Sequence, residues 1–265
     1  MAPPPEEVAY EAGTLHEDPR FRAGVLLLRM GLERQAADEL AAVDPARLRG
    51  EAVLLVADLL DRAGDHRDAH HLLRTAGRDF LRRPPEGQNL RVWRIAYPPA
   101  YRDHVVRWAP LSSVPPDLLQ ALMREESALD RRAVSPAGAI GLTQLMLPTA
   151  QGVARRLRLP RPSRADLMDA DVNIRIGSRY LGDLLARYDG SAALALAAYN
   201  AGMGAVGRWL ADRRDLDLDE FVEEIPYEET RGYVKRVLRS YAAYSLLYGK
   251  PVEEALLLDQ KLPGT

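Results

Sequence analysis

The chain has 265 residues, 47% of them apolar, which is enough for two modest domains with substantial cores. Its formal net charge of −2 excludes a bulk attraction to nucleic acid or to anionic membranes. It has no cysteine, which excludes disulfides, thiolate metal sites and cysteine nucleophiles. No apolar run reaches the roughly 18 residues that span a bilayer. The acidic, proline-rich start is not a secretory signal, so the protein either stays inside the cell or is a trimmed piece of an exported one.

We expect residues 1–18 to form a flexible arm and residues 19–85 to form helical hairpins of the tetratricopeptide kind, which repeat about every 34 residues. Five residues return 33 positions later: Arg29, Gly31, Arg34, Ala36 and Leu40 recur as Arg62, Gly64, Arg67, Ala69 and Leu73. Two repeats are too few to stand alone, so they pack on the rest of the chain or continue an array that lies before residue 1. The abrupt start inside the repeats favours a truncated sequence.

Residues 86–114 are predicted to be a linker and connector. This stretch carries Trp93, Tyr97, Tyr101 and Trp108 around a Pro-Pro break. Aromatic residues in such a place are typical of a packed core or interface, and a binding platform is the alternative.

The stretch from Pro115 predicts a helix, with Pro115 and Pro116 ending anything before it and Asp117 as its N-terminal cap or first-turn acid. At about 100° per residue, one face of this helix is apolar. That face holds Leu118, Leu119, Leu122, Met123 and Leu129, whereas Gln120, Arg124 and Ser127 lie on the other side. Glu125 lies at the edge of the apolar stripe, and Glu126 lies near its middle.

A carboxylate in an apolar stripe needs an explanation, because burying an unpaired charge costs several kcal/mol. Such a group keeps its proton, so its pKa rises. A carboxylic acid still protonated near neutral pH is what general-acid cleavage of a glycosidic bond requires. The alternative is that Glu126 caps a neighbouring helix or pairs with an arginine.

The rest of the chain reads as helices. We expect a short helix at about 142–157, an amphipathic helix from Asp169 to an Asp189-Gly190 turn, a helix capped by Ser191 and broken by Gly202 and Gly204, and a long last helix after Pro226. The loop between the first two is basic: Arg155, Arg156, Arg158, Arg161 and Arg164 form either a solvated surface or a contact for an anionic polymer. No strand-rich region is present, so the predicted fold class is all-α.

Four separated segments carry polar residues that helix packing does not need. They are Glu126-Ser127, the run from Gly141 to Met146, the run from Ala198 to Gly202, and Ile225-Pro226 with Glu229-Thr230-Arg231. In this order and spacing they resemble the catalytic domain of soluble lytic transglycosylases, the goose-lysozyme-like SLT enzymes of bacterial cell-wall turnover. The resemblance covers about residues 90–250, and the helical repeats resemble the superhelical region that precedes this domain in larger members.

The resemblance implies a lysozyme-like catalytic domain at 115–250, followed by a C-terminal tail at 251–265. By position, Glu126 rather than Glu125 matches the single catalytic acid and base. The residues that match the family's substrate-binding positions are Ser135, Gln144, Met146, Tyr199, Asn200 and Glu229. The sequence departs from the family pattern at Leu129-Asp130-Arg131, at Thr143, and at Met146-Leu147-Pro148, which puts local loop geometry and substrate preference in question.

The implied reaction cleaves the bond between N-acetylmuramic acid and N-acetylglucosamine of peptidoglycan, without water, to leave a 1,6-anhydro sugar. It needs no metal and no organic cofactor. The implied partner is the glycan strand in the periplasm or cell envelope, and the repeats leave room for a protein partner.

Two alternatives to this reading remain open. A hydrolytic lysozyme would need a second acid such as Asp130. An inactive scaffold would keep only the binding role of the repeats. A metal site at His66, His70 and His71 lacks the glutamate of a zincin motif, and a solvated helix face fits those residues better.

Overall fold

The computed structural model describes residues 10–213 and 215–249, and these fall into two compact helical units that are divided between Pro98 and Pro99. Helices dominate the described residues, and β-structure there is limited to isolated bridges, so the all-α prediction is confirmed. Most of the expected arm, residues 1–9, and the whole expected tail, 251–265, lie outside the described residues. The rest of the arm is ordered: Gly13–Glu17 form a 3-10 helix in which Leu15 is fully buried.

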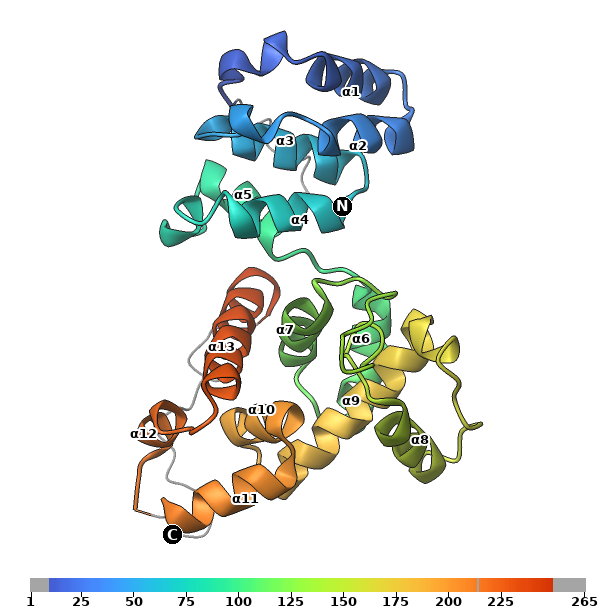
Figure 1. Ribbon diagram of the computed structural model, residues 1–265, viewed down its shortest axis with the longest axis vertical. Helices are drawn as coiled ribbons and strands as arrows, with labels where there is room; N and C mark the ends of the chain where they lie inside the picture. The colour runs from blue at the N-terminus through green and yellow to red at the C-terminus, as the bar shows by residue number, and fades with distance from the viewer. Residues whose placement is uncertain (1–9, 214, 250–265) are drawn as a thin grey trace. The chain divides into compact units, whose positions relative to one another are not determined.

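The first unit is a stack of short helices (Figure 1). Its helices are α1 (Pro19–Arg29), α2 (Glu33–Ala41), α3 (Glu51–Arg62), α4 (His66–Thr75) and α5 (Gln88–Ala96). Gly31 and Gly64 occupy the turns inside the hairpins α1–α2 and α3–α4, both with positive φ (73° and 79°), which glycine adopts without strain. The repeated Ala36 and Ala69 are both fully buried. The 33-residue recurrence therefore corresponds to two equivalent hairpins.

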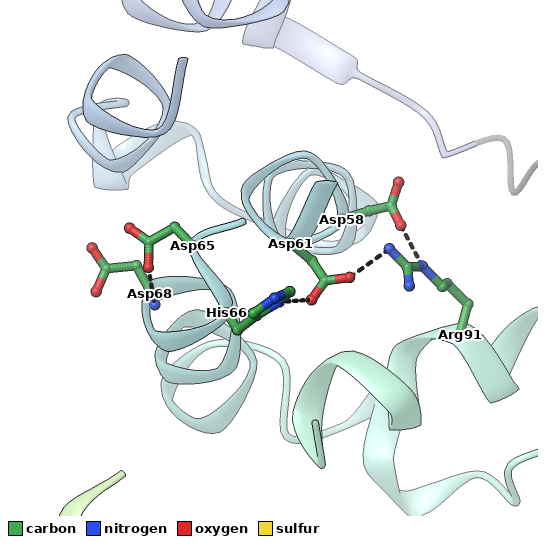
Figure 2. Close-up of polar contacts among 6 residues, drawn as sticks. All are labelled: Asp58, Asp61, Asp65, His66, Asp68 and Arg91. Atoms are coloured by element: carbon green, nitrogen blue, oxygen red, sulfur yellow. Dashed lines mark hydrogen bonds and ion pairs between the residues drawn. The ribbon is translucent and has the colours of Figure 1, made fainter. Parts of the chain in front are cut away.

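A partly buried polar cluster links α5 to α3 (Figure 2). The Arg91 guanidinium donates to Asp58 Oδ1 and Asp61 Oδ2, both at 2.7 Å, and His66 Nδ1 lies 2.7 Å from Asp61 Oδ1. Burial opposes ionisation of Asp61, but the His66 hydrogen bond and the Arg91 charge hold its pKa below the usual range. The half of the expected connector that contains Trp93 thus belongs to the first unit, where Trp93 also stacks on Tyr97 with ring centroids 5.4 Å apart.

The second unit surrounds α7, and its helices are drawn from green to red in Figure 1. They are α6 (Arg102–Trp108), α7 (Pro116–Ser127), α8 (Leu147–Arg156), α9 (Ala170–Arg187), α10 (Ala192–Ala201), α11 (Met203–Asp212), α12 (Leu218–Glu223) and α13 (Glu228–Tyr248). Helix α7 packs along α13, and α10 packs against both α9 and α13. Helix α7, which carries the expected catalytic residue, and the long helix α13 are therefore direct neighbours.

Helix α7 is buried on its polar side as well as on its apolar side. Gln120, Arg124 and Ser127 are at most 9% exposed, and each makes internal hydrogen bonds. The Gln120 amide, for example, donates to the Ala100 carbonyl at 2.9 Å. Asp117 is a first-turn acid, paired with Arg102 at 2.7 Å. A helix buried all round holds its side chains in fixed positions, which matters for Glu126.

Two helix boundaries differ from the prediction. Helix α8 begins at Leu147 rather than near residue 142, because residues 140–145 form a tight turn closed by hydrogen bonds between Ile140 and Leu145. Gly202, at φ 84°, separates α10 from α11, but Gly204 lies inside α11 and does not interrupt it. Across the described residues, every helix is too short or too polar to cross a bilayer.

Candidate active site

Glu126 lies in the last turn of α7, and its carboxylate Oε1 accepts a 2.6 Å hydrogen bond from the Tyr233 hydroxyl of α13. Burial raises the pKa of Glu126 from 4.5 to about 7. The Tyr233 hydrogen bond and the charge of Arg236 oppose this shift, and the neighbouring charge of Glu125 adds to it. The chain thus provides a carboxyl group that keeps its proton to a higher pH than an ordinary glutamic acid does.

Glu125, the other acid of the pair, has a structural environment. Its side chain is 1% exposed and forms an ion pair with the buried Arg124 guanidinium. The Ser240 hydroxyl donates to Glu125 Oε1 at 2.7 Å, and Arg236 Nε lies 3.8 Å from Oε2. Glu125 therefore takes part in ion pairs and a hydrogen bond between α7 and α13, whereas Glu126 has no arginine in direct contact among the described residues. The alternative that Glu126 pairs with an arginine is therefore wrong, because its hydrogen-bond partner is Tyr233.

Ser127, the residue after Glu126, is hydrogen-bonded to the loop that contains Leu142. The Ser127 hydroxyl donates to the carbonyls of Met123, at 3.0 Å, and Leu142, at 2.9 Å. The next residue, Thr143, is fully buried, and its amide and hydroxyl both donate to Asn173 Oδ1 on α9. The departure of Thr143 from the family pattern thus introduces a hydroxyl that anchors the loop to α9.

Tyr199 of α10 is hydrogen-bonded to this loop. Its hydroxyl donates to the Thr143 carbonyl at 2.7 Å. Burial raises the pKa of Tyr199 well above 10, and the charge of Glu126 raises it further, which means that the two groups are close enough to interact. Tyr199, Tyr233 and Glu126 therefore form one cluster drawn from α10, α13 and α7.

The other residues expected from the loop make no direct hydrogen bond to Glu126 in the described structure. Gln144, at φ 46°, donates from its amide to the Gly141 carbonyl at 2.8 Å. Ser135 accepts from the Ala139 amide at 3.0 Å. Met146 precedes α8 and is 43% exposed. Gln144 and Ser135 thus shape the loop itself, and Met146 is available at the surface.

Asn200 and Glu229 lie where α10 meets α13. Asn200 Oδ1 accepts a 2.6 Å hydrogen bond from Thr230, and the Asn200 side chain is exposed. Glu229 is exposed in the first turn of α13. It lines an open hollow of about 570 Å³ together with Glu228, Arg231, Gly232, Lys235 and Arg236. Arg236, which lines this hollow, also lowers the pKa of Glu126 through its charge.

Neither rival site is assembled in the described structure. Asp130 follows two residues with positive φ, and its Oδ1 accepts a hydrogen bond from the Arg132 amide at 2.8 Å. The carboxylate whose charge raises the pKa of Glu126 is Glu125. His66 pairs with Asp61. No group of three His, Cys, Asp or Glu side chains in the described parts of the chain is arranged to hold a metal ion.

Sequence reasoning missed the partner of the acid, Tyr233. It lies 107 residues after Glu126, and only the packing of α7 on α13 brings the two together. A usable signal was present: Tyr233 follows Glu229 by four residues, so the two lie along one side of a helix.

We expect Tyr233→Phe to raise the pKa of Glu126 above about 7, by about one unit, because the lost hydrogen bond favours the ionised form. A ¹³C NMR titration of the Glu126 carboxyl carbon measures this directly. Tyr241→Phe is the matched control, since Tyr241 lies two turns further along α13 and does not act on Glu126. A Glu126 titration curve that is the same in Tyr233→Phe as in wild type would contradict the assignment.

Comparisons with known proteins agree with this geometry. Residues 105–222 match the family model of the transglycosylase SLT domain. The chain is 38% identical over 155 residues to the soluble lytic murein transglycosylase of Escherichia coli K12, an alignment covering 58% of this chain and 24% of that protein. It is 42% identical over 131 residues to a putative soluble lytic murein transglycosylase of Haemophilus influenzae, covering 49% and 22%. The chain thus spans about a quarter of the length of these curated relatives.

Solved structures of the same group are also similar. An inactive glutamate-to-glutamine mutant of the lytic transglycosylase Slt from Pseudomonas aeruginosa aligns with a TM-score of 0.73 and 29% identity over 92% of this chain and 38% of that one. The 70 kDa soluble lytic transglycosylase of Escherichia coli aligns with a TM-score of 0.72 and 28% identity over 91% and 38%. The chain is therefore an SLT-domain homologue of the soluble lytic murein transglycosylases.

Proposed function

We propose that this protein is a lytic transglycosylase that cleaves the β-1,4 bond between N-acetylmuramic acid and N-acetylglucosamine in peptidoglycan and leaves a 1,6-anhydro end. The observation that carries the proposal is the Glu126 carboxyl, with a pKa of about 7 and a tyrosine hydrogen bond, inside an SLT domain. The names of the relatives give murein as the material on which those proteins act.

In the first step, protonated Glu126 donates its proton to the glycosidic oxygen. The bond from that oxygen to C1 of the muramoyl sugar breaks, the N-acetylglucosamine leaves with a hydroxyl group, and positive charge develops at C1. In the second step, Glu126, now a carboxylate, takes the proton of the muramoyl C6 hydroxyl while O6 bonds to C1. The acid is regenerated and no water is consumed. Because the attacking oxygen belongs to the same sugar, little entropy is lost in positioning it.

A pKa of about 7 suits a group that must both give and take a proton near neutral pH. The Tyr233 hydroxyl supports the carboxylate that exists between the two steps, because it donates to Oε1. The phenols of Tyr199 and Tyr233 both keep their protons at neutral pH, since burial raises the pKa of each. Tyr199 and the exposed amide of Asn200 are proposed to supply dipoles for the charge at C1. Ser135, Gln144, Met146 and Glu229 are proposed to contact the glycan strand.

The test is a digest of purified sacculi with the wild-type protein, analysed by mass spectrometry. The expected products end in 1,6-anhydro-N-acetylmuramic acid and are lighter by one water than hydrolysed ends. Hydrolysed, reducing ends would instead identify a lysozyme, and the absence of soluble products would favour an inactive scaffold. We propose that the protein acts in the periplasm or elsewhere in the cell envelope, where its proposed substrate lies.

A further inference from the structure

One segment of the second unit is strongly basic although the chain as a whole is slightly acidic. Residues 131–165 contain seven arginines and no aspartate or glutamate, in a chain whose formal net charge is −2. The same segment holds Ser135, Gln144 and Met146, which we propose as substrate contacts. The charge is therefore concentrated on the part of the unit that forms one side of the proposed glycan site.

Six of these seven guanidinium groups are not neutralised by an acid in the described structure. Arg156 pairs with Asp183 at 2.8 Å. The six others are exposed and form no ion pair among the described residues; we call them the arginine surface: Arg131, Arg132, Arg155, Arg158, Arg161 and Arg164. The nearby carboxylates are used elsewhere, since Asp166 accepts from the Ser163 amide and hydroxyl and Asp169 caps α9.

The arginine surface is continuous with the loop that holds the proposed substrate contacts. A Cβ added at Gly138 would lie 3.9 Å from Arg164 Nη1, so Arg164 borders the turn formed by Ser135 and Ala139. Arg131 donates to the Met168 carbonyl at 3.2 Å, which joins the loop before α8 to the loop after it. Both loops flank α8 in Figure 1.

Two of the arginines lie at the C-terminal end of α8. The backbone of Arg158 is left-handed, with φ 56°, as is common for a residue that ends a helix, and the Leu159 amide donates to the Ala154 carbonyl at 2.9 Å. Arg155 and Arg158 project from the C-terminal end of α8 without a hydrogen-bonded partner for their guanidinium groups in the described structure. The helix dipole favours one or two cations at the C-terminal end of α8, but it does not explain six arginines spread over that end and the adjacent loops.

We propose that the arginine surface binds the stem-peptide carboxylates of the peptidoglycan strand whose sugars occupy the site at Glu126. The inference rests on the proposed substrate, and it adds that the stem peptides contribute to binding through their negative charges. Exposed arginine–carboxylate pairs are individually weak, so several act together, and the contact is sensitive to salt.

The test compares two triple variants in a Glu126→Gln background, which prevents turnover. Arg155→Gln/Arg158→Gln/Arg164→Gln removes half of the arginine surface. Arg22→Gln/Arg29→Gln/Arg34→Gln removes the same charge from exposed positions of the first unit. Binding to purified sacculi is measured by co-sedimentation at about 20 mM and about 500 mM NaCl. We expect the surface variant to bind about tenfold more weakly at low salt and the control variant to change by less than about twofold, with the difference gone at high salt.

Two further arms identify the charged group. Sacculi whose carboxylates have been converted to neutral amides with carbodiimide and ethanolamine should bind both variants equally. Equal weakening by the two triple variants, or a surface effect that persists on amidated sacculi, would overturn the proposal. If the Arg155→Gln/Arg158→Gln/Arg164→Gln variant loses binding to phosphatidylglycerol vesicles but still binds sacculi normally, the arginine surface binds a lipid and the proposal is overturned. A wild-type digest without anhydro products would refute the proposed reaction, whereas this comparison of binding decides the arginine surface separately.

Discussion

Glu126→Gln is expected to lower the rate of release of anhydro products from sacculi by about 10³-fold or more. Glutamine has nearly the shape of glutamic acid, but its amide can neither give a proton to the glycosidic oxygen nor take one from the C6 hydroxyl. One group serves both steps of the proposed mechanism, so both are lost together. The measurement is the rate of product release followed by chromatography and mass spectrometry, with Glu224→Gln, an exposed glutamate of the same unit, as the control.

The same substitution should make the fold more stable above neutral pH, which separates a chemical effect from unfolding. Folding raises the pKa of Glu126 from 4.5 to about 7, so the folded state holds a proton that the unfolded state has released in that interval. Wild-type stability therefore falls as the pH rises from about 4.5 to about 7 because of this group, and glutamine removes that fall. We expect Glu126→Gln to be more stable by about 2 kcal/mol at pH 8, with the difference disappearing near pH 4.

Two outcomes would contradict the role of Glu126. Activity in Glu126→Gln comparable to that of Glu224→Gln would mean that another group supplies the proton. A variant that is inactive and also destabilised at every pH would mean that the loss of activity reports unfolding.

Gly141→Ala is expected to cost the second unit about 3–5 kcal/mol of unfolding free energy. Gly141 begins the loop that carries Thr143 and Gln144, and it has φ 77°. A Cβ at this position would overlap the Leu167 carbonyl oxygen and the Asn173 amide, neither of which is a free side-chain end. The Asn173 amide would have to leave its hydrogen bonds to the Ile140 and Leu167 carbonyls, so the loop itself would be displaced.

Gly190→Ala separates the two causes of the loss of stability, namely the steric overlap of the added Cβ and the positive φ of the backbone. Gly190 has nearly the same φ, 84°, but nothing lies within 4 Å of an added Cβ. It should cost only the conformational part, about 1 kcal/mol. Urea unfolding of both variants measures the difference. Equal costs at the two positions would show that the packing around Gly141 can adjust. Gly141→Ala should also lose most of its activity, because the loop positions Tyr199 and the proposed sugar contacts.

Much of the fold follows from short-range patterns in the sequence. The Asp189-Gly190 turn, the Ser191 cap and the break at Pro226 were placed by residues that act on their own neighbours, and the structure has each of them. The repeated glycines Gly31 and Gly64 were found for the same reason. Such features depend on backbone preferences that tertiary packing does not reverse.

The candidate site was predicted in part. A carboxyl in an apolar stripe pointed to Glu126, because its burial follows from helix geometry alone. The environments of Arg124 and Glu125 did not follow from α7, since the helix is also buried by α13, which supplies Ser240 and Arg236. The start of α8 was misplaced because the turn at 140–145 is fixed by Asn173 from another helix. Each miss involves a partner that lies far away in the sequence.

The hydrogen bond between Glu126 and Tyr233 joins two positions 107 residues apart, one near the start of the second unit and one in its last helix. During synthesis, the acid therefore emerges from the ribosome well before the phenol that supports it. Until α13 docks, α7 lacks the neighbour that buries Glu126, and a carboxyl open to water titrates near its ordinary pKa. Under the proposed mechanism, a nascent or partly unfolded chain would therefore lack the protonated acid near neutral pH, and we expect activity to arise only once α13 has docked on α7.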